Sequence, residues 1–135
     1  MVMPMNRMAF SIFPVLLISA CASAGDNESD LADSTWTFIA IDGADPASGE
    51  ARLSLARDRL NANVGCNGLD GPWRVEGGRL IAGPLVQTRM HCEGPVWDQE
   101  KAIGSLLSAA PRVIVEGDFM TIEASGHSAE LRRTS

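Results

Sequence analysis

Two cysteines enclose the stretch that most constrains how this chain can fold. The stretch begins with Gly65-Cys66-Asn67-Gly68 and ends with Thr88-Arg89-Met90-His91-Cys92. A bond between the two thiols would close a loop of about 27 residues, which on the chain-entropy estimate stabilises a fold by roughly 3 to 4 kcal/mol. If the thiols pair, the rest of the chain must pack around this covalently closed loop.

The first twenty residues indicate export rather than a folded domain. The apolar run from Met8 to Ile18 is shorter than the roughly 20 residues that a membrane-spanning helix needs, and Pro14 would kink such a helix. It leads into Ile18-Ser19-Ala20-Cys21, which resembles a bacterial lipobox. We therefore predict a lipoprotein signal peptide over residues 1–20 and lipidation of Cys21. The alternative is an ordinary signal peptide with a coincidental cysteine.

The residues after Cys21 predict where the protein is held. The residue after the cysteine is Ala22 and not an aspartate. By resemblance to bacterial lipoproteins, this favours the outer membrane, with the domain facing the periplasm. Several acyl chains, at about 0.8 kcal/mol per buried CH₂, anchor a domain firmly. Residues 21–33 are small and acidic without apolar periodicity, which predicts a flexible tether between the lipid and the domain.

The charge of the chain bears on its partners. The whole chain has a formal net charge of −6, and Arg7 is the only charged residue before Cys21, so the charge from Cys21 onward is −7. A surface of this sign repels phosphate backbones, which argues against a nucleic-acid partner.

Alternation of apolar and polar residues with a period of two dominates the domain and is typical of antiparallel strands with one wet face. Turn signals at Asp42-Gly43, Gly77-Gly78 and Gly117-Asp118 separate the strands. The expected strands lie at residues 36–41, 52–56, 59–64, 73–76, 79–82, 113–115, 120–122 and 129–131. Residues 65–71 break the pattern with three glycines, and residues 85–90 suggest an irregular extended segment against the sheet.

One helix is expected between Pro95, which suits a first helical turn, and Pro111, which ends it. Its apolar face combines Val96, Ile103, Leu106, Leu107 and Ala110, while Glu100 and Lys101 are expected at the edge of that face or in solvent. Together these patterns predict an α+β, mostly β fold. A single domain over residues 34–133 would form a curled antiparallel sheet of about eight strands packed around one helix.

The ordered set of motifs resembles the META-domain family, which includes the heat-shock-associated, HslJ-like lipoproteins of bacterial envelopes. The residues that carry the likeness are Trp36, Asp42-Gly43, Gly65-Cys66-Asn67, Trp73, Gly77, Leu80, Gly83-Pro84-Leu85, Thr88-x-Met90-x-Cys92, Glu100 and Gly117-Asp118. The resemblance implies a curled antiparallel sheet with one helix in the bacterial envelope. It implies no enzymatic activity, because the family has no established catalytic residues.

Cys66 and Cys92 remain as an even pair once Cys21 carries lipid, and in an oxidising envelope the simplest interpretation is a disulfide. Free buried thiols are one alternative. Another is a metal site formed by Cys66, His91 and Cys92, which lacks a clear fourth ligand and whose adjacent histidine and cysteine would point apart on a strand.

Other candidate residues have both a functional and a structural interpretation. Polar side chains near the central segment either form a functional surface or satisfy backbone groups around an irregular loop: Asn67, Thr88, Arg89 and Glu100. Trp36, Trp73 and Trp97 either fill the core or line a ligand pocket, and His127 is expected to be solvated in a turn. The sequence suggests no catalytic, metal or cofactor-binding set.

Two functions are therefore weighed. The first is a non-enzymatic envelope lipoprotein that binds an unknown protein partner and supports the envelope under stress. The alternative is a carrier for a small apolar ligand or lipid, with a cavity between sheet and helix. An enclosed cavity larger than roughly 300 Å³ would favour the carrier.

Overall fold

The computed structural model describes Val2, Pro14 and residues 28–135. The predicted lipidation site, Cys21, and nearly all of the predicted signal peptide lie outside the described residues. In the part that is described, no helix has the length and apolarity needed to cross a membrane.

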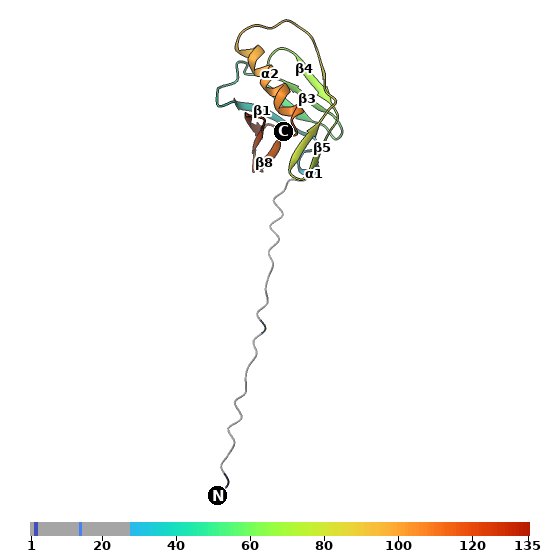
Figure 1. Ribbon diagram of the computed structural model, residues 1–135, viewed down its shortest axis with the longest axis vertical. Coiled ribbons are helices and arrows are strands. Elements are labelled where there is room, and N and C mark those ends of the chain that lie inside the picture. The colour runs from blue at the N-terminus through green and yellow to red at the C-terminus, as the bar shows by residue number, and fades with distance from the viewer. Residues whose placement is uncertain (1, 3–13, 15–27) are drawn as a thin grey trace.

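The domain is one antiparallel sheet of ten strands that curls around a helix, with strand order β5-β6-β8-β9-β10-β1-β2-β3-β4-β7 (Figure 1). The elements are α1 (Glu28–Leu31), β1 (Ser34–Ile41), β2 (Arg52–Leu55), β3 (Leu60–Asn63), β4 (Gly68–Gly71), β5 (Trp73–Glu76), β6 (Arg79–Ala82), β7 (Val86–Gln87), α2 (Pro95–Ser108), β8 (Arg112–Glu116), β9 (Phe119–Ala124) and β10 (His127–Arg133). The predicted fold class is confirmed, with ten strands in place of about eight.

Buried and more exposed side chains alternate along β1, which lies in the middle of the sheet. Trp36 and Phe38 are buried on one face, and then the pairing with β10 shifts register between Phe38 and Ala40. Such a bulge moves the following residues by one position, so Ile41, rather than Ala40, is the next fully buried side chain. Ile39 at the bulge is partly exposed.

The three predicted turns are confirmed. Gly77 and Gly78 both have positive φ, at 56° and 74°, and they join β5 to β6 as a two-residue hairpin. Asp42 and Gly43 follow the same pattern at the end of β1, with φ of 50° and 77°. The Gly117-Asp118 turn joins β8 to β9.

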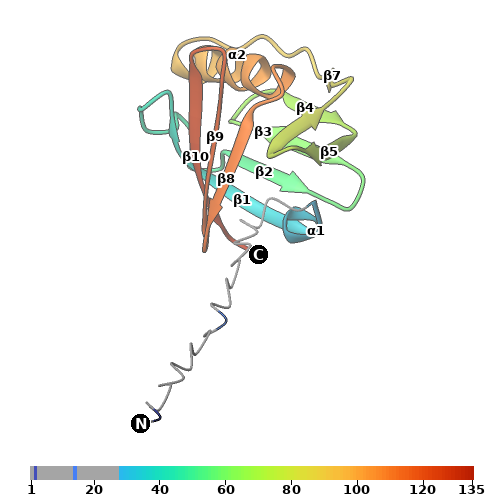
Figure 2. The same cartoon turned by 60° about the horizontal axis from the view of Figure 1, so that its bottom comes forward.

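Helix α2 begins at Pro95, as expected, and lies across one end of the curled sheet, opposite the β8–β9 turn and the C-terminus (Figure 2). Ile103, Leu106 and Leu107 are buried from this helix, and Lys101 is exposed. Two expectations for its inner face need correction. Val96 is only half-buried, and Ala110 lies beyond the end of the helix with a φ of 51°.

Two segments differ from the sequence interpretation. The glycine-rich stretch expected to interrupt the sheet contains β4, where Gly71 is needed because a Cβ there would lie 2.6 Å from the Pro84 carbonyl oxygen. The expected tether over residues 21–33 includes α1, and Leu31 in it is 1% exposed. Within the described residues, the packed domain therefore begins with α1, at Glu28, rather than at residue 34.

The core is filled by large side chains. Trp36 is fully buried and its Nε1 donates to Ser34 Oγ at 2.7 Å, while Trp73 donates to the Ala56 carbonyl at 2.7 Å. Both indole N–H groups thus have partners, which is the usual requirement for a buried tryptophan. Trp97, by contrast, is half-buried at the surface. The core interpretation is therefore right for two of the three tryptophans.

His127 is not simply solvated. Its Nδ1 lies 2.8 Å from Asp42 Oδ2, and the Ser128 N–H donates to Asp42 Oδ1 at 2.9 Å, so the start of β10 is bonded to the end of β1. Burial raises the pKa of the Asp42 carboxyl, but the hydrogen bonds from His127 and Ser128 and the charge of His127 outweigh it, and the pKa is lowered.

This lowered pKa predicts a pH-dependent contribution to stability. Because the Asp42 carboxyl binds its proton less tightly in the folded state, its stabilisation is present above the unfolded pKa of about 3.9 and is lost as the pH falls through the folded pKa. Asp42→Asn should lower the melting temperature near pH 7, and its difference from the wild type should shrink toward about pH 2. A difference that is equal at both pH values would contradict the assignment.

Candidate functional site

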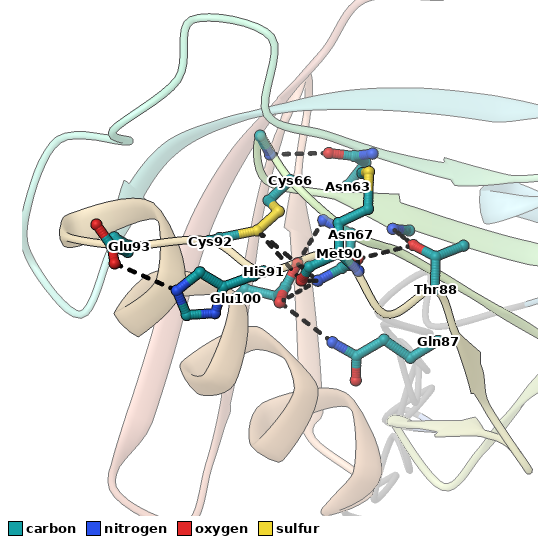
Figure 3. The surroundings of a disulfide bond; sticks show 12 residues. Asn63, Cys66, Asn67, Gln87, Thr88, Met90, His91, Cys92, Glu93 and Glu100 are labelled. Carbon is teal, nitrogen blue, oxygen red and sulfur yellow. Dashed lines mark hydrogen bonds and ion pairs between the residues drawn. A yellow bond between two sulfur atoms is a disulfide. The ribbon is translucent and has the colours of Figure 1, made fainter.

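A buried asparagine organises the loops at one end of the sheet (Figure 3). Asn67 is 2% exposed, and its Oδ1 accepts hydrogen bonds from the Met90 N–H at 2.6 Å and from Thr88 Oγ1 at 3.0 Å. Its Nδ2 donates to the Met90 carbonyl at 3.0 Å. The side chain therefore substitutes for a strand partner along residues 88–90, where regular pairing with β4 ends.

Glu100 completes this network, contrary to the expectation that it lies at the helix edge or in solvent. It is 2% exposed and accepts from the Asn67 backbone N–H at 2.5 Å, from Asn67 Nδ2 at 3.0 Å and from Gln87 Nε2 at 3.2 Å. Within residues 28–135 none of the ion pairs includes Glu100. Neutral donors alone thus satisfy a buried carboxyl group, which makes the site sensitive to the loss of any of them.

The disulfide fixes the same loops. The Cys66 and Cys92 sulfurs are bonded, and their Cα atoms are 6.4 Å apart, inside the predicted limit of about 7 Å. A Glu100 oxygen and the two sulfurs all lie within 4.8 Å of one another. His91 is not part of this group, because its ring faces Glu93 at 3.2 Å and its side chain is 80% exposed. The metal site considered for Cys66, His91 and Cys92 is therefore not formed.

Removal of the disulfide should destabilise the protein by roughly 3 to 4 kcal/mol, because the bond joins two residues that are 26 positions apart in the sequence. The measurement is urea denaturation of the purified, oxidised protein with and without a small dithiol reductant. The Cys66→Ala, Cys92→Ala double variant, which has no bond to reduce, should show no effect of the reductant. Equal midpoints for the oxidised and reduced wild type would show that the cysteines are not paired in solution.

The four candidate polar residues do not all belong to one network. Asn67, Thr88 and Glu100 are linked through the hydrogen bonds above, and the Thr88 Oγ1 also accepts from the Gly68 N–H at 3.0 Å. The Arg89 side chain is outside this network and exposed. It lines a surface hollow of about 380 Å³ together with Asn67, Gln87, Thr88, Met90, His91 and Trp97. The network has a structural role, and the exposed part of this region is the candidate functional surface.

A second, larger hollow adjoins the first and shares Gln87 and Trp97 with it. It has a volume of about 670 Å³ and lies between β7 and α2. Leu69, Leu85 and Gln87 line it from the strand side, and residues of α2 line it from the other: Trp97, Glu100, Lys101, Gly104, Ser105 and Ser108. We call these two adjoining hollows the β7–α2 groove.

Two exposed apolar side chains lie on the segment that borders the groove. Val86 in β7 is 71% exposed and Met90 is 57% exposed. Sequence reasoning named Asn67, Thr88, Arg89 and Glu100, which line the two hollows, but it missed the apolar part of this surface, because residues 85–90 lacked a clear pattern. The one signal present was the apolar Val86 and Met90 flanking polar residues, which a count of unplaced apolar side chains would have found.

Comparisons with known proteins agree with this architecture. No curated protein sequence matches the chain. A solved structure described as the NMR structure of the protein from Burkholderia xenovorans is 24% identical, with a TM-score of 0.64, and the match covers 80% of this chain and 86% of that one. Another, described only as an NMR structure, is 17% identical with a TM-score of 0.69, covering 78% and 93%. At these identities the two structures show the fold alone.

The sequence itself matches the model of the META domain over residues 29–135. This range starts within α1 and ends at the last residue, so it covers the packed domain except for Glu28. The resemblance expected from the motifs is thereby confirmed, and the chain belongs to the META domain family.

Proposed function

We propose that this protein is a non-enzymatic, lipid-anchored protein of the bacterial envelope that binds a partner protein through the β7–α2 groove and so supports the envelope under stress. The observation that carries the proposal is the exposed Met90 side chain in an open groove that also contains Leu85 and Trp97. Contiguous apolar surface rimmed by polar residues marks interaction sites in soluble domains. The family match and the predicted lipobox support the location.

The anchor gives the first test. Cys21→Ser should release the protein from the membrane fraction, because the thiol that would carry the acyl chains is gone. The measurement is sedimentation of membranes followed by detection of the mature-length chain in pellet and supernatant. Cys66→Ser serves as a matched control, since it removes a different cysteine and should leave the protein in the pellet. A Cys21→Ser chain of mature length that still sediments would refute the anchor.

The partner is tested by photocrosslinking in cells that produce the full-length chain. A photoreactive phenylalanine analogue at position 90 should give a discrete protein adduct, because the Met90 side chain is exposed at the groove. The same analogue at position 119 is the control, because Phe119 is comparably exposed, at 53%, but starts β9 beside the β8–β9 turn. Adducts at neither position, or the same adducts at both, would contradict the proposal.

A carrier of small apolar ligands is the second candidate, favoured by the Leu69, Leu85 and Trp97 lining of the larger hollow. The filled interior argues against it, because Trp36, Leu106 and Leu107 belong to one core cluster and have no exposed surface. The hollow itself lies at the surface between β7 and α2. Native-state binding of an apolar dye, competed by fatty acid and abolished by filling the hollow at Gly104, would favour the carrier.

A further inference from the structure

Strand β7 lies at the edge of the sheet, beside β4. Its register with β4 shows which backbone groups of β7 do not bond to β4. The Thr88 N–H donates to the Gly68 carbonyl at 3.1 Å, and Gln87 lies opposite Leu69. In an antiparallel pair, residues whose groups bond to the neighbour alternate with residues whose groups point the other way. The N–H and C=O of Gln87 therefore point to the open side of β7.

Helix α2 leaves room along that open side. Gly104 lies on the helix wall of the groove, and a Cβ added there would meet no atom within 4 Å. Ser105 and Ser108 line the same wall with short side chains. The Gln87 side chain reaches Glu100 on the helix at 3.2 Å, but around Gly104 and the two serines the hollow of about 670 Å³ leaves open space for another main chain.

The side chains around the edge define the chemistry of what fits. Leu85 and Trp97 offer apolar contacts in the hollow that Gln87 also lines. Arg89 is exposed, and within residues 28–135 it has no carboxylate close enough for an ion pair. In a domain with a strong excess of acidic residues, an unpaired arginine at the mouth of a groove favours an acidic group on the ligand.

We infer that the partner binds as an extended peptide segment that adds a strand to β7. Its main chain pairs with the N–H and C=O of Gln87, an apolar side chain contacts Leu85 and Trp97, and an acidic side chain lies beside Arg89. Strand addition of this kind takes affinity from main-chain hydrogen bonds and specificity from alternate side chains. The inference rests on the proposed function and names the form in which the partner is recognised.

The test uses the full-length lipidated protein in detergent and a synthetic probe peptide of about ten residues, in which one aspartate precedes alternating valine and threonine. The decisive comparison is Gln87→Pro against Gln87→Ala. Both variants lose the side-chain bond to Glu100, but only proline lacks the outward N–H, and the ladder to β4 does not use that N–H. We expect the probe to bind Gln87→Pro at least about tenfold more weakly than Gln87→Ala.

Three further comparisons do not depend on whether the fold tolerates proline at position 87. A probe with N-methyl groups on alternate residues cannot donate to β7 and should bind at least about tenfold more weakly than the plain probe. Gly104→Phe should block the groove, whereas Gly104→Ala, which adds one carbon into open space, should bind the probe like the wild type. Arg89→Glu should weaken binding, and Arg112→Glu, on β8, should not.

Several results would overturn the inference. They are equal binding by Gln87→Pro and Gln87→Ala, equal binding of the plain and N-methylated probes, or no binding of the plain probe at about 1 mM. The crosslink from position 90 separates this failure from failure of the proposed function. If the adduct persists in Gly104→Phe, the partner binds but not as an added strand. If position 90 gives no adduct in the wild type, the proposed function itself is wrong.

Discussion

Replacing Asn67 with aspartate is expected to lower the free energy of unfolding by about 3 to 5 kcal/mol, the range for leaving a buried charge without its partner. The change is nearly isosteric, so its effect comes from chemistry rather than volume. The Nδ2 that donates to Glu100 at 3.0 Å and to the Met90 carbonyl at 3.0 Å becomes an oxygen. Two carboxyl groups would then face each other where both residues are 2% exposed.

Asn63→Asp is the matched control for this variant. The Asn63 Oδ1 accepts from the Gly65 N–H at 2.8 Å, a bond that an aspartate keeps, and Asn63 lies opposite Arg52 on β2. We expect this control to change stability by no more than about 0.5 kcal/mol. Chemical denaturation of the two variants beside the wild type gives both values. Comparable losses in both would mean that the Asn67 network contributes little.

Leu107→Ala is expected to cost about 3 to 5 kcal/mol, in the upper part of the range for truncated core leucines. Leu107 has no exposed surface, and it lies on the face of α2 that packs against the curled sheet. Its removal would leave a cavity between helix and sheet that neighbours such as Ile103 and Leu106 cannot fill without moving. The measurement is again the free energy of unfolding from denaturant titration.

Ser105→Ala provides the comparison on the exposed side of the same helix. It removes a hydroxyl at a position that lines the groove, and alanine has the higher helix propensity, so stability should be unchanged or slightly raised. A loss below about 1 kcal/mol for Leu107→Ala, together with native-state binding of apolar dye, would instead indicate a loosely packed interior and favour the carrier.

The strands could be predicted where each residue's environment follows from local alternation. Residues 73–76 and 79–82 have the predicted limits, because a glycine turn fixes the register of the hairpin between them. Strand β4 could not be predicted, because its glycines lack the β-propensity of the other strands. The need for glycine at position 71 is visible only in the structure, where Gly71 packs against the Pro84 carbonyl.

The sequence predicted which residues form the network, but not the burial of Glu100 or its hydrogen-bond partners. Asn67, Thr88 and Glu100 were singled out, yet Glu100 was expected near solvent because a charged helical residue is usually exposed. Its partners are Asn67, 33 positions away, and Gln87, 13 positions away. No local pattern in the sequence encodes such distant hydrogen bonds. The shape of the groove could not be predicted for the same reason, since its two walls come from separate segments.

The pairing of β1 with β10 bears on how the domain can be made. Strand β1, the first in the chain, lies between β2 and β10, the last in the chain, with Phe38 opposite Leu131 and Ile41 opposite Ala129. While the chain is still being synthesised, β1 therefore has one open side, and the sheet stays split until the final residues emerge. Completion of the fold is thus coupled to release of the chain, and a product truncated before His127 would expose two long unpaired edges prone to aggregation.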